Sequence, residues 1–107
     1  MISTHILDTQ VGRPATNVQV ILSKIEGDSW KELQKSSTNG DGRISFDCKN
    51  EQGKYKLDFN LSEYFHTQNN DFFFTEAPLI FQIKDTARKY HVPILLSSFG
   101  YTTYRGS

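Results

Sequence analysis

The clearest structural signal in the sequence is the strict alternation of apolar and polar residues in the segment Lys54-Tyr55-Lys56-Leu57-Asp58-Phe59-Asn60. Successive side chains of a β-strand point to opposite faces, so Tyr55, Leu57 and Phe59 share one face while the charged residues share the other. This pattern predicts a strand with one face in a hydrophobic core and the other in water.

The same two-residue period recurs on both sides of this segment along the chain. It is carried by Val18, Val20 and Leu22, by Ile44 and Phe46, and by Leu79, Phe81 and Ile83. Turn-forming residues separate these runs, at Val11-Gly12-Arg13-Pro14, Glu26-Gly27-Asp28 and Asn39-Gly40-Asp41-Gly42. Short strands at this regular spacing predict a mainly β fold built as a sandwich of two sheets.

Two segments depart from the alternating pattern. Tyr90 to Ser97 is apolar on both faces, which in so small a domain indicates that another subunit covers one of them. The one helical candidate begins at Asn60-Leu61-Ser62-Glu63, because Asn60 is a good N-cap and Glu63 is placed for a capping box. We expect a helix of about two turns, followed by a loop over residues 66–74.

The composition fits one soluble domain spanning residues 1–107. Twelve Lys and Arg balance twelve Asp and Glu, so the chain lacks the positive field that draws nucleic acid or anionic lipid. We therefore expect neither nucleic-acid nor membrane partners. Cys48 is the only cysteine, which excludes an intrachain disulfide. Because residues 1–8 show no export signal, we expect a cytoplasmic location.

The residues that could carry chemistry are scattered along the chain. His5, His66 and His91 are too far apart for a local zinc-binding spacing, and Cys48 has no adjacent histidine to activate it. Histidine also serves as a general acid or base near neutral pH. His91 shares a strand face with apolar neighbours such as Pro93, so it is either a core histidine with both nitrogens hydrogen-bonded or a functional group.

Arg43 and the last residues of the chain leave similar alternatives open. Arg43 follows a turn and alternates with Ile44 and Phe46, as a solvated surface arginine would. The segment Tyr101 to Ser107 carries two tyrosines and an arginine where chain ends usually fray. We expect this segment to be a docked strand.

Five motifs carry a resemblance to a known family. They are Thr4-His5-Ile6-Leu7-Asp8, Gly12-Arg13-Pro14-Ala15, Asn39-Gly40-Asp41-Gly42-Arg43, Tyr90-His91-Val92-Pro93-Ile94-Leu95-Leu96-Ser97 and Tyr104-Arg105-Gly106-Ser107. Together they resemble the 5-hydroxyisourate hydrolase family, the transthyretin-like enzymes of urate breakdown. The resemblance covers essentially the whole chain, and Tyr104 to Ser107 is its most specific element because transthyretin lacks that ending.

The resemblance implies a transthyretin-like, two-sheet antiparallel β-sandwich of eight strands with one short helix between the fifth and sixth. It also implies a homotetramer, assembled as a dimer of dimers, with active sites at the dimer–dimer interface. In that arrangement His5, Arg43 and His91 lie on one sheet, with the terminal strand beside the last of them. Three residues distant in sequence would then form one polar cluster.

The implied reaction is hydrolysis of 5-hydroxyisourate to 2-oxo-4-hydroxy-4-carboxy-5-ureidoimidazoline, with no metal or other cofactor. His5 and His91 would act as acid and base, and Arg43 would bind substrate carbonyls and the developing oxyanion. His5 would also contact the substrate. Ser107, through its terminal carboxylate or its hydroxyl, would orient a histidine or the water, and Tyr104 would hold the ring.

Two other functions fit a sandwich of this size. One is a transthyretin-type module that binds a small hydrophobic ligand in the same channel without catalysis, although two His and one Arg would make that channel unusually polar. The other is a structural or adhesive domain of a larger secreted protein. Coverage of the chain by one family resemblance and the absence of an export signal argue against it.

Overall fold

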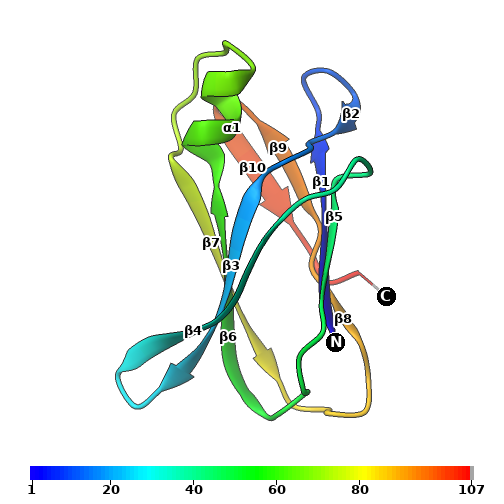
Figure 1. Cartoon of the computed structure of the whole chain (residues 1–107), viewed down its shortest axis with the longest axis vertical. Coiled ribbons are helices and arrows are strands. Elements are labelled where there is room, and N and C mark those ends of the chain that lie inside the picture. The colour runs from blue at the N-terminus through cyan, green and yellow to red at the C-terminus, as the bar shows by residue number, and fades with distance from the viewer. Residues whose placement is uncertain (107) are drawn as a thin grey trace.

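The computed structural model describes residues 1–106, whose strands form two sheets that enclose the core, with one short helix beside them (Figure 1). The six-stranded sheet consists of β1 (Ile2–Asp8), β2 (Arg13–Pro14), β5 (Arg43–Phe46), β8 (Tyr90–His91), β9 (Ile94–Ser97) and β10 (Gly100–Thr103). The four-stranded sheet consists of β3 (Gln19–Glu26), β4 (Ser29–Ser37), β6 (Gly53–Asn60) and β7 (Glu76–Ile83). The helix α1 is Leu61–Thr67 and lies between β6 and β7 in the chain.

The hydrophobic core lies between the two sheets, where the predicted alternation places it. In β6, Tyr55, Leu57 and Phe59 are buried while the residues between them are partly exposed. Strand β1 of the opposite sheet alternates in the same way and buries Ile2 and Ile6. Each fully buried side chain of this size stabilises the fold by roughly 1.5–3 kcal/mol relative to leaving it exposed. The sandwich follows from these two apolar faces.

Helix α1 begins where the sequence predicts. The side-chain oxygen of Asn60 accepts a hydrogen bond from the backbone N–H of Glu63 at 3.4 Å, and the Asn60 amide donates to the Glu63 carboxylate at 3.3 Å. Leu61, Tyr64 and Phe65 are buried on the face turned to the core. The expected cap and the expected apolar face are both confirmed.

The strand pattern differs from the eight-stranded antiparallel scheme in two details. Residues 1–106 form ten strand segments, since β2 is a separate two-residue segment and Val92-Pro93 interrupt the expected strand from Tyr90 to Ser97. Proline has no N–H to give to a ladder, which accounts for the break. The six-stranded sheet is also not wholly antiparallel, because β1 pairs in parallel with β8 and β9.

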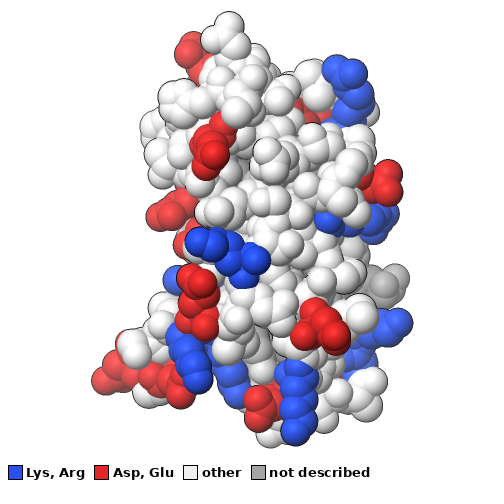
Figure 2. All heavy atoms as spheres, in the orientation of Figure 1, with Lys and Arg blue, Asp and Glu red and all other residues white. Residues whose placement is uncertain are grey.

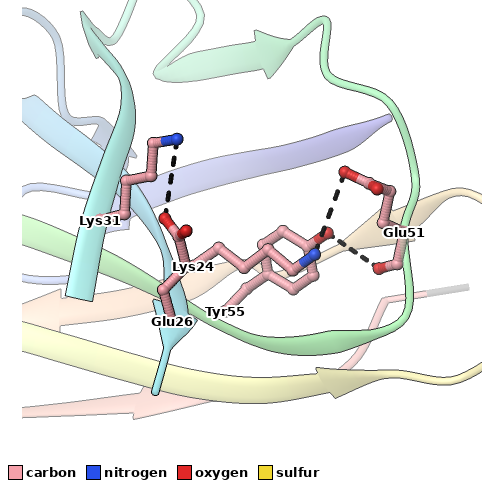
Figure 3. Close-up of polar contacts among 5 residues, drawn as sticks. All are labelled: Lys24, Glu26, Lys31, Glu51 and Tyr55. Atoms are coloured by element: carbon pink, nitrogen blue, oxygen red, sulfur yellow. Dashed lines mark hydrogen bonds and ion pairs between the residues drawn. The ribbon is translucent and has the colours of Figure 1, made fainter. Parts of the chain in front are cut away.

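The two sheets are joined at one end by the segment that follows β5. Tyr55 donates a hydrogen bond through its hydroxyl to the Glu51 carbonyl at 2.8 Å, and the Lys24 ammonium lies 3.9 Å from the Glu51 carboxylate (Figure 3). A second ion pair, Lys31 with Glu26 at 3.6 Å, links β4 to the end of β3. Exposed pairs of this kind stabilise by at most about 1 kcal/mol, so the Tyr55 hydrogen bond is the firmer anchor.

Charged side chains of both signs are interspersed over the face shown in Figure 2, without a large area of one sign. This matches the equal numbers of acidic and basic residues in the sequence. Among residues 1–106, no helix is long and apolar enough to cross a membrane.

Candidate active site

The turn before β5 fixes the position of Arg43. The side-chain oxygen of Asn39 accepts hydrogen bonds from the backbone N–H groups of Asp41 at 2.9 Å and of Arg43 at 3.0 Å. Gly42 has a φ of +70°, and its carbonyl accepts a hydrogen bond from the N–H of Ile6 at 2.9 Å. A residue with a side chain is strained at this φ, so the glycine lets the turn deliver Arg43 into the ladder beside β1.

His5 and Arg43 are directly opposed in the β1–β5 ladder. Cβ atoms of such a pair lie about 4.5–5.5 Å apart. Thr4 and Ile6 on either side of His5 are buried, and Ile44 after Arg43 is also buried. His5 and Arg43 therefore project from the other side of the six-stranded sheet, which we call the outer face. The outer-face residues of β1, β5, β8 and β9 include Ser3, His5, Leu7, Arg43, Ser45, His91 and Leu95.

His91 is brought to the outer face by the parallel pairing of β8 with β1. It is in register with Ser3, whose hydroxyl oxygen lies 2.8 Å from His91 Nδ1. The N–H of Val92 donates to the Ser3 carbonyl at 2.9 Å, so the backbone on both sides of this contact is tied. Because the register is the same before and after the break, Pro93 lies beside His5. The strands β1, β5 and β8 adjoin one another (Figure 1). They carry His5, Arg43 and His91, and we call these three residues the polar cluster.

The C-terminal segment returns to His91. Gly106 forms an isolated bridge with His91, and its N–H donates to the His91 carbonyl at 2.8 Å. The predicted strand is shorter than expected, since β10 ends at Thr103 and only this bridge continues the pairing. Ser107 lies outside the described residues, so its predicted role stays a prediction.

Tyr104 is placed elsewhere. Its side chain is 57% exposed and lines a cavity of about 570 Å³ between the edge strand β7 and the C-terminal segment. Ile80, Tyr90 and Arg105 also line this cavity, and none of the polar cluster does. The predicted contact of Tyr104 with the substrate has no support from its position within this chain.

Burial lowers the pKa of His91 below its ordinary value, and the nearby charges of Arg43 and His5 lower it further. A hydrogen bond with the Ser3 backbone acts in the opposite direction. The net effect keeps the imidazole neutral at pH 7, the form that can accept a proton. The electrostatic influence of Arg43 and His5 on His91 is a consequence of their shared location.

The remaining candidate groups stand apart from the polar cluster. His66 is exposed in the last turn of α1 and packs edge-to-face on Phe72, with ring centroids 5.1 Å apart. Cys48 packs against the core, and burial raises the pKa of its thiol, which disfavours the nucleophilic thiolate. Within residues 1–106, His, Cys, Asp and Glu side chains form no group of three or more that could hold a metal ion.

Two residues of this region were not singled out from the sequence. Ser3 became significant only through its contact with His91, which is 88 residues away. Gly106 belongs to the terminal motif, but its packing against His91 depends on the fold. The alternation of β1 could have shown that Ser3 shares a face with His5, although not that it meets His91.

Comparison with known proteins identifies the family of this chain. The HIUase/Transthyretin family profile matches residues 2–106. The chain belongs to this family. That membership confirms the resemblance drawn from the five motifs and the transthyretin-like sandwich expected from it.

Three relatives show the range of the HIUase/Transthyretin family around this chain. The 5-hydroxyisourate hydrolase of Salmonella typhimurium is 42% identical over 110 residues, covering 100% of this chain and 81% of that protein. The structure of Klebsiella pneumoniae 5-hydroxyisourate hydrolase matches with a TM-score of 0.86 at 36% identity, over 99% of this chain and 98% of that one. Sea bream transthyretin in complex with thyroxine matches with a TM-score of 0.92 at 26% identity, over 98% and 93%.

Proposed function

We propose that this chain hydrolyses 5-hydroxyisourate to 2-oxo-4-hydroxy-4-carboxy-5-ureidoimidazoline, and that His5, Arg43 and His91 carry out the reaction. The activity is the one for which its bacterial relatives are named. The observation that carries the assignment of residues is the placement of the polar cluster on three adjoining strands of one sheet face.

Hydrolysis of a ring amide makes three demands on a site. Water must lose a proton as its oxygen attacks the ring carbonyl, the carbonyl oxygen must be stabilised as it becomes negative, and the departing ring nitrogen must gain a proton. A neutral imidazole meets the first demand and, once protonated, the third, so His5 and His91 share these roles. Each such proton transfer contributes on the order of 10²- to 10⁴-fold to the rate.

Arg43 meets the second demand. Its guanidinium remains charged at all working pH values and offers several N–H donors in one plane, which suits a substrate rich in carbonyl groups. In the ladder it stands directly opposite His5, so a carbonyl bound by Arg43 would lie next to a proton-transferring group. Loss of one oxyanion donor costs roughly 2.7–4 kcal/mol of transition-state stabilisation.

Ser107 completes the proposal as a group that orients a histidine or the water. Its support is the neighbouring Gly106, which is bonded to His91. Tyr104 is kept as a candidate for holding the substrate ring. Because it lies away from the polar cluster of its own chain, this role requires Tyr104 to reach a site formed with another subunit.

The polar cluster supports catalysis over ligand carriage. A hydrophobic small ligand favours a channel with few polar groups, whereas the outer face here presents two imidazoles and a guanidinium. The thyroxine-bound relative shares the fold of this chain. The polar side chains on the outer face of this chain nevertheless favour hydrolysis over ligand carriage.

We further propose a homotetramer, arranged as a dimer of dimers, in which the outer face of one subunit meets that of another. Among the described residues the outer face is only partly covered, by Gly106 at His91, and Leu95 on the same face is 36% exposed. Excluding water from such a cluster strengthens its electrostatic effects on the substrate. Analytical ultracentrifugation would test the assembly, and a purely monomeric protein would contradict it.

We also propose a cytoplasmic location, which suits the free thiol of Cys48.

The activity is tested by following freshly generated 5-hydroxyisourate by ultraviolet absorbance. We expect decay to be faster with the protein than without it and the product to be chiral. A His91→Ala variant that remains folded should fall back to the spontaneous rate. Unchanged decay with the wild-type protein would leave ligand binding as the alternative function.

A further inference from the structure

Ser3 lies on the outer face near the start of β1, between β5 and β8, and is not among the groups assigned above. It is in register with Ser45 on one side and with His91 on the other, and it is two residues from His5 on β1. Residues two apart on a strand share a face. Ser3 therefore neighbours Ser45, His91 and His5 on the outer face, and the last two belong to the polar cluster.

The contact between Ser3 and His91 is local, polar and partly buried. The hydroxyl oxygen lies 2.8 Å from Nδ1, the usual separation for a hydrogen bond, across 88 residues of sequence. The backbones are held together at the same place, because Tyr90 donates to the Met1 carbonyl at 3.1 Å and Val92 to the Ser3 carbonyl at 2.9 Å. The hydroxyl is thus kept next to Nδ1 by the ladder itself.

The other edge of the imidazole is also confined. A Cβ at Gly106 would lie 2.6 Å from Cδ2 of His91, so the glycine backbone packs directly against the ring. Within residues 1–106, Nε2 of His91 makes no hydrogen bond, whereas Nδ1 has the Ser3 hydroxyl. Among the described residues, the hydrogen bonding of this ring is therefore confined to Nδ1 and Ser3.

We propose that Ser3 is a positioning residue that keeps a proton on Nδ1 of His91 and thereby leaves Nε2 as the proton-accepting nitrogen. In the proposed tautomer the hydroxyl oxygen accepts the hydrogen bond from Nδ1–H, across the 2.8 Å that separates the two atoms. A neutral imidazole carries one N–H, and the partner of one nitrogen sets which of the two is protonated. This inference rests on the proposed function for its effect on turnover, but the state of the ring is independent of it.

The experiment compares wild-type protein with Ser3→Ala, Ser3→Thr and Ser45→Ala, each labelled with ¹⁵N in its histidines. Two-bond ¹H–¹⁵N correlations identify the protonated nitrogen, and His91→Gln assigns the signals. We expect wild-type His91 to be protonated at Nδ1, and Ser3→Ala to lose that preference. Ser3→Thr keeps the hydroxyl and should restore it. Ser45→Ala removes a matched serine on the opposite side of Ser3 and should leave the His91 signals unchanged.

Kinetics give the second readout. Loss of one hydrogen bond of this kind corresponds to about a 2- to 13-fold fall in kcat for Ser3→Ala, with KM changed less than kcat. Ser3→Thr should recover most of this loss, which a merely structural role would not require. Thermal unfolding would show that each variant is folded.

Wild-type His91 protonated at Nε2, or unaltered His91 signals in folded Ser3→Ala, would overturn the proposal. Unaltered kcat in Ser3→Ala would overturn its part in turnover. If the wild-type protein fails to hydrolyse 5-hydroxyisourate, the proposed function falls, while the NMR comparison still decides the role of Ser3 at His91.

Discussion

The backbone N–H of Gly106 donates a hydrogen bond to the carbonyl of His91 at 2.8 Å, and the same glycine packs against the imidazole ring. The relationship joins the C-terminal segment to the polar cluster. Adding a side chain at position 106 therefore tests directly how closely His91 must be held.

Gly106→Ala is expected to impair turnover more than folding. The new Cβ would lie 2.6 Å from Cδ2 of His91, and a rotation of the ring that relieves this clash would disturb its contact with Ser3. We expect kcat to fall by at least the 2- to 13-fold range of about one hydrogen bond. Gly100→Ala is the matched control, because its Cβ would meet only Ser97 at 4.0 Å. Equal activity of the two variants would contradict the tight packing.

Arg43→Ala is expected to reduce kcat/KM by roughly 10²- to 10³-fold, the usual effect of removing an oxyanion donor. Arg43 is exposed, so its removal should leave the free energy of unfolding within about 0.5 kcal/mol of wild type. Arg43→Lys keeps the charge without the planar fork and should show intermediate activity. Lys35→Ala, on β4 of the other sheet, is the control and should turn over normally. Near-wild-type hydrolysis by Arg43→Ala would remove Arg43 from the reaction.

The pH dependence of kcat/KM should reflect the lowered pKa of His91. Its neutral form is required to accept a proton, so activity should fall as the pH drops through a midpoint below about 6.5, the ordinary value. Arg43 is one of the charges that lower this pKa, and Arg43→Gln should therefore move the residual acid limb to higher pH. Steady-state rates between pH 4.5 and 8 in the two proteins check the direction. A midpoint that stays in place would show that the limb belongs to another group.

The lowered pKa of His91 also makes the free energy of unfolding depend on pH. The unfolded chain binds a proton at His91 near the ordinary pKa and the folded chain only at lower pH, so this residue makes folding less favourable as the pH falls through that interval. Above the ordinary value the contribution is constant.

Gly42→Ala is expected to destabilise the fold by about 1–3 kcal/mol, the usual cost of a strained backbone or an overpacked contact. Gly42 has a φ of +70°, and a Cβ there would lie 2.8 Å from both the Ile6 carbonyl oxygen and Cβ of Pro14. Gly40→Ala in the same turn is the control, since its Cβ would meet nothing within 4 Å. Urea unfolding of both variants measures the difference. A Gly42→Ala protein as stable as Gly40→Ala would show that the turn adjusts freely.

Local features of the fold could be predicted because their causes are local. Asn60 caps α1 through a residue three positions away, and the alternation of β6 follows from burial of one face. Strand β4 gave no comparable signal. Seven of its nine residues are exposed, so it owes its conformation to pairing with β3 and not to its own apolar pattern.

The candidate site could be predicted only in part. The motif resemblance placed His5, Arg43 and His91 together, and the ladder positions agree with it. The partner of His91 could not be foreseen, since parallel pairing of β1 and β8 brings together residues that no local spacing relates. The position of Tyr104 beside β7 likewise depends on where β10 ends.

The parallel ladder between β1 and β8 has a consequence for synthesis on the ribosome. A nascent chain that has emerged as far as residue 60 already contains both strands that place His5 opposite Arg43 in the fold, yet the strand that carries His91 has still to be translated. Closing a loop of 88 residues costs chain entropy, and such distant contacts are among the slower ones to form. A cluster that includes His91 can therefore assemble only after the C-terminal part of the chain has been translated.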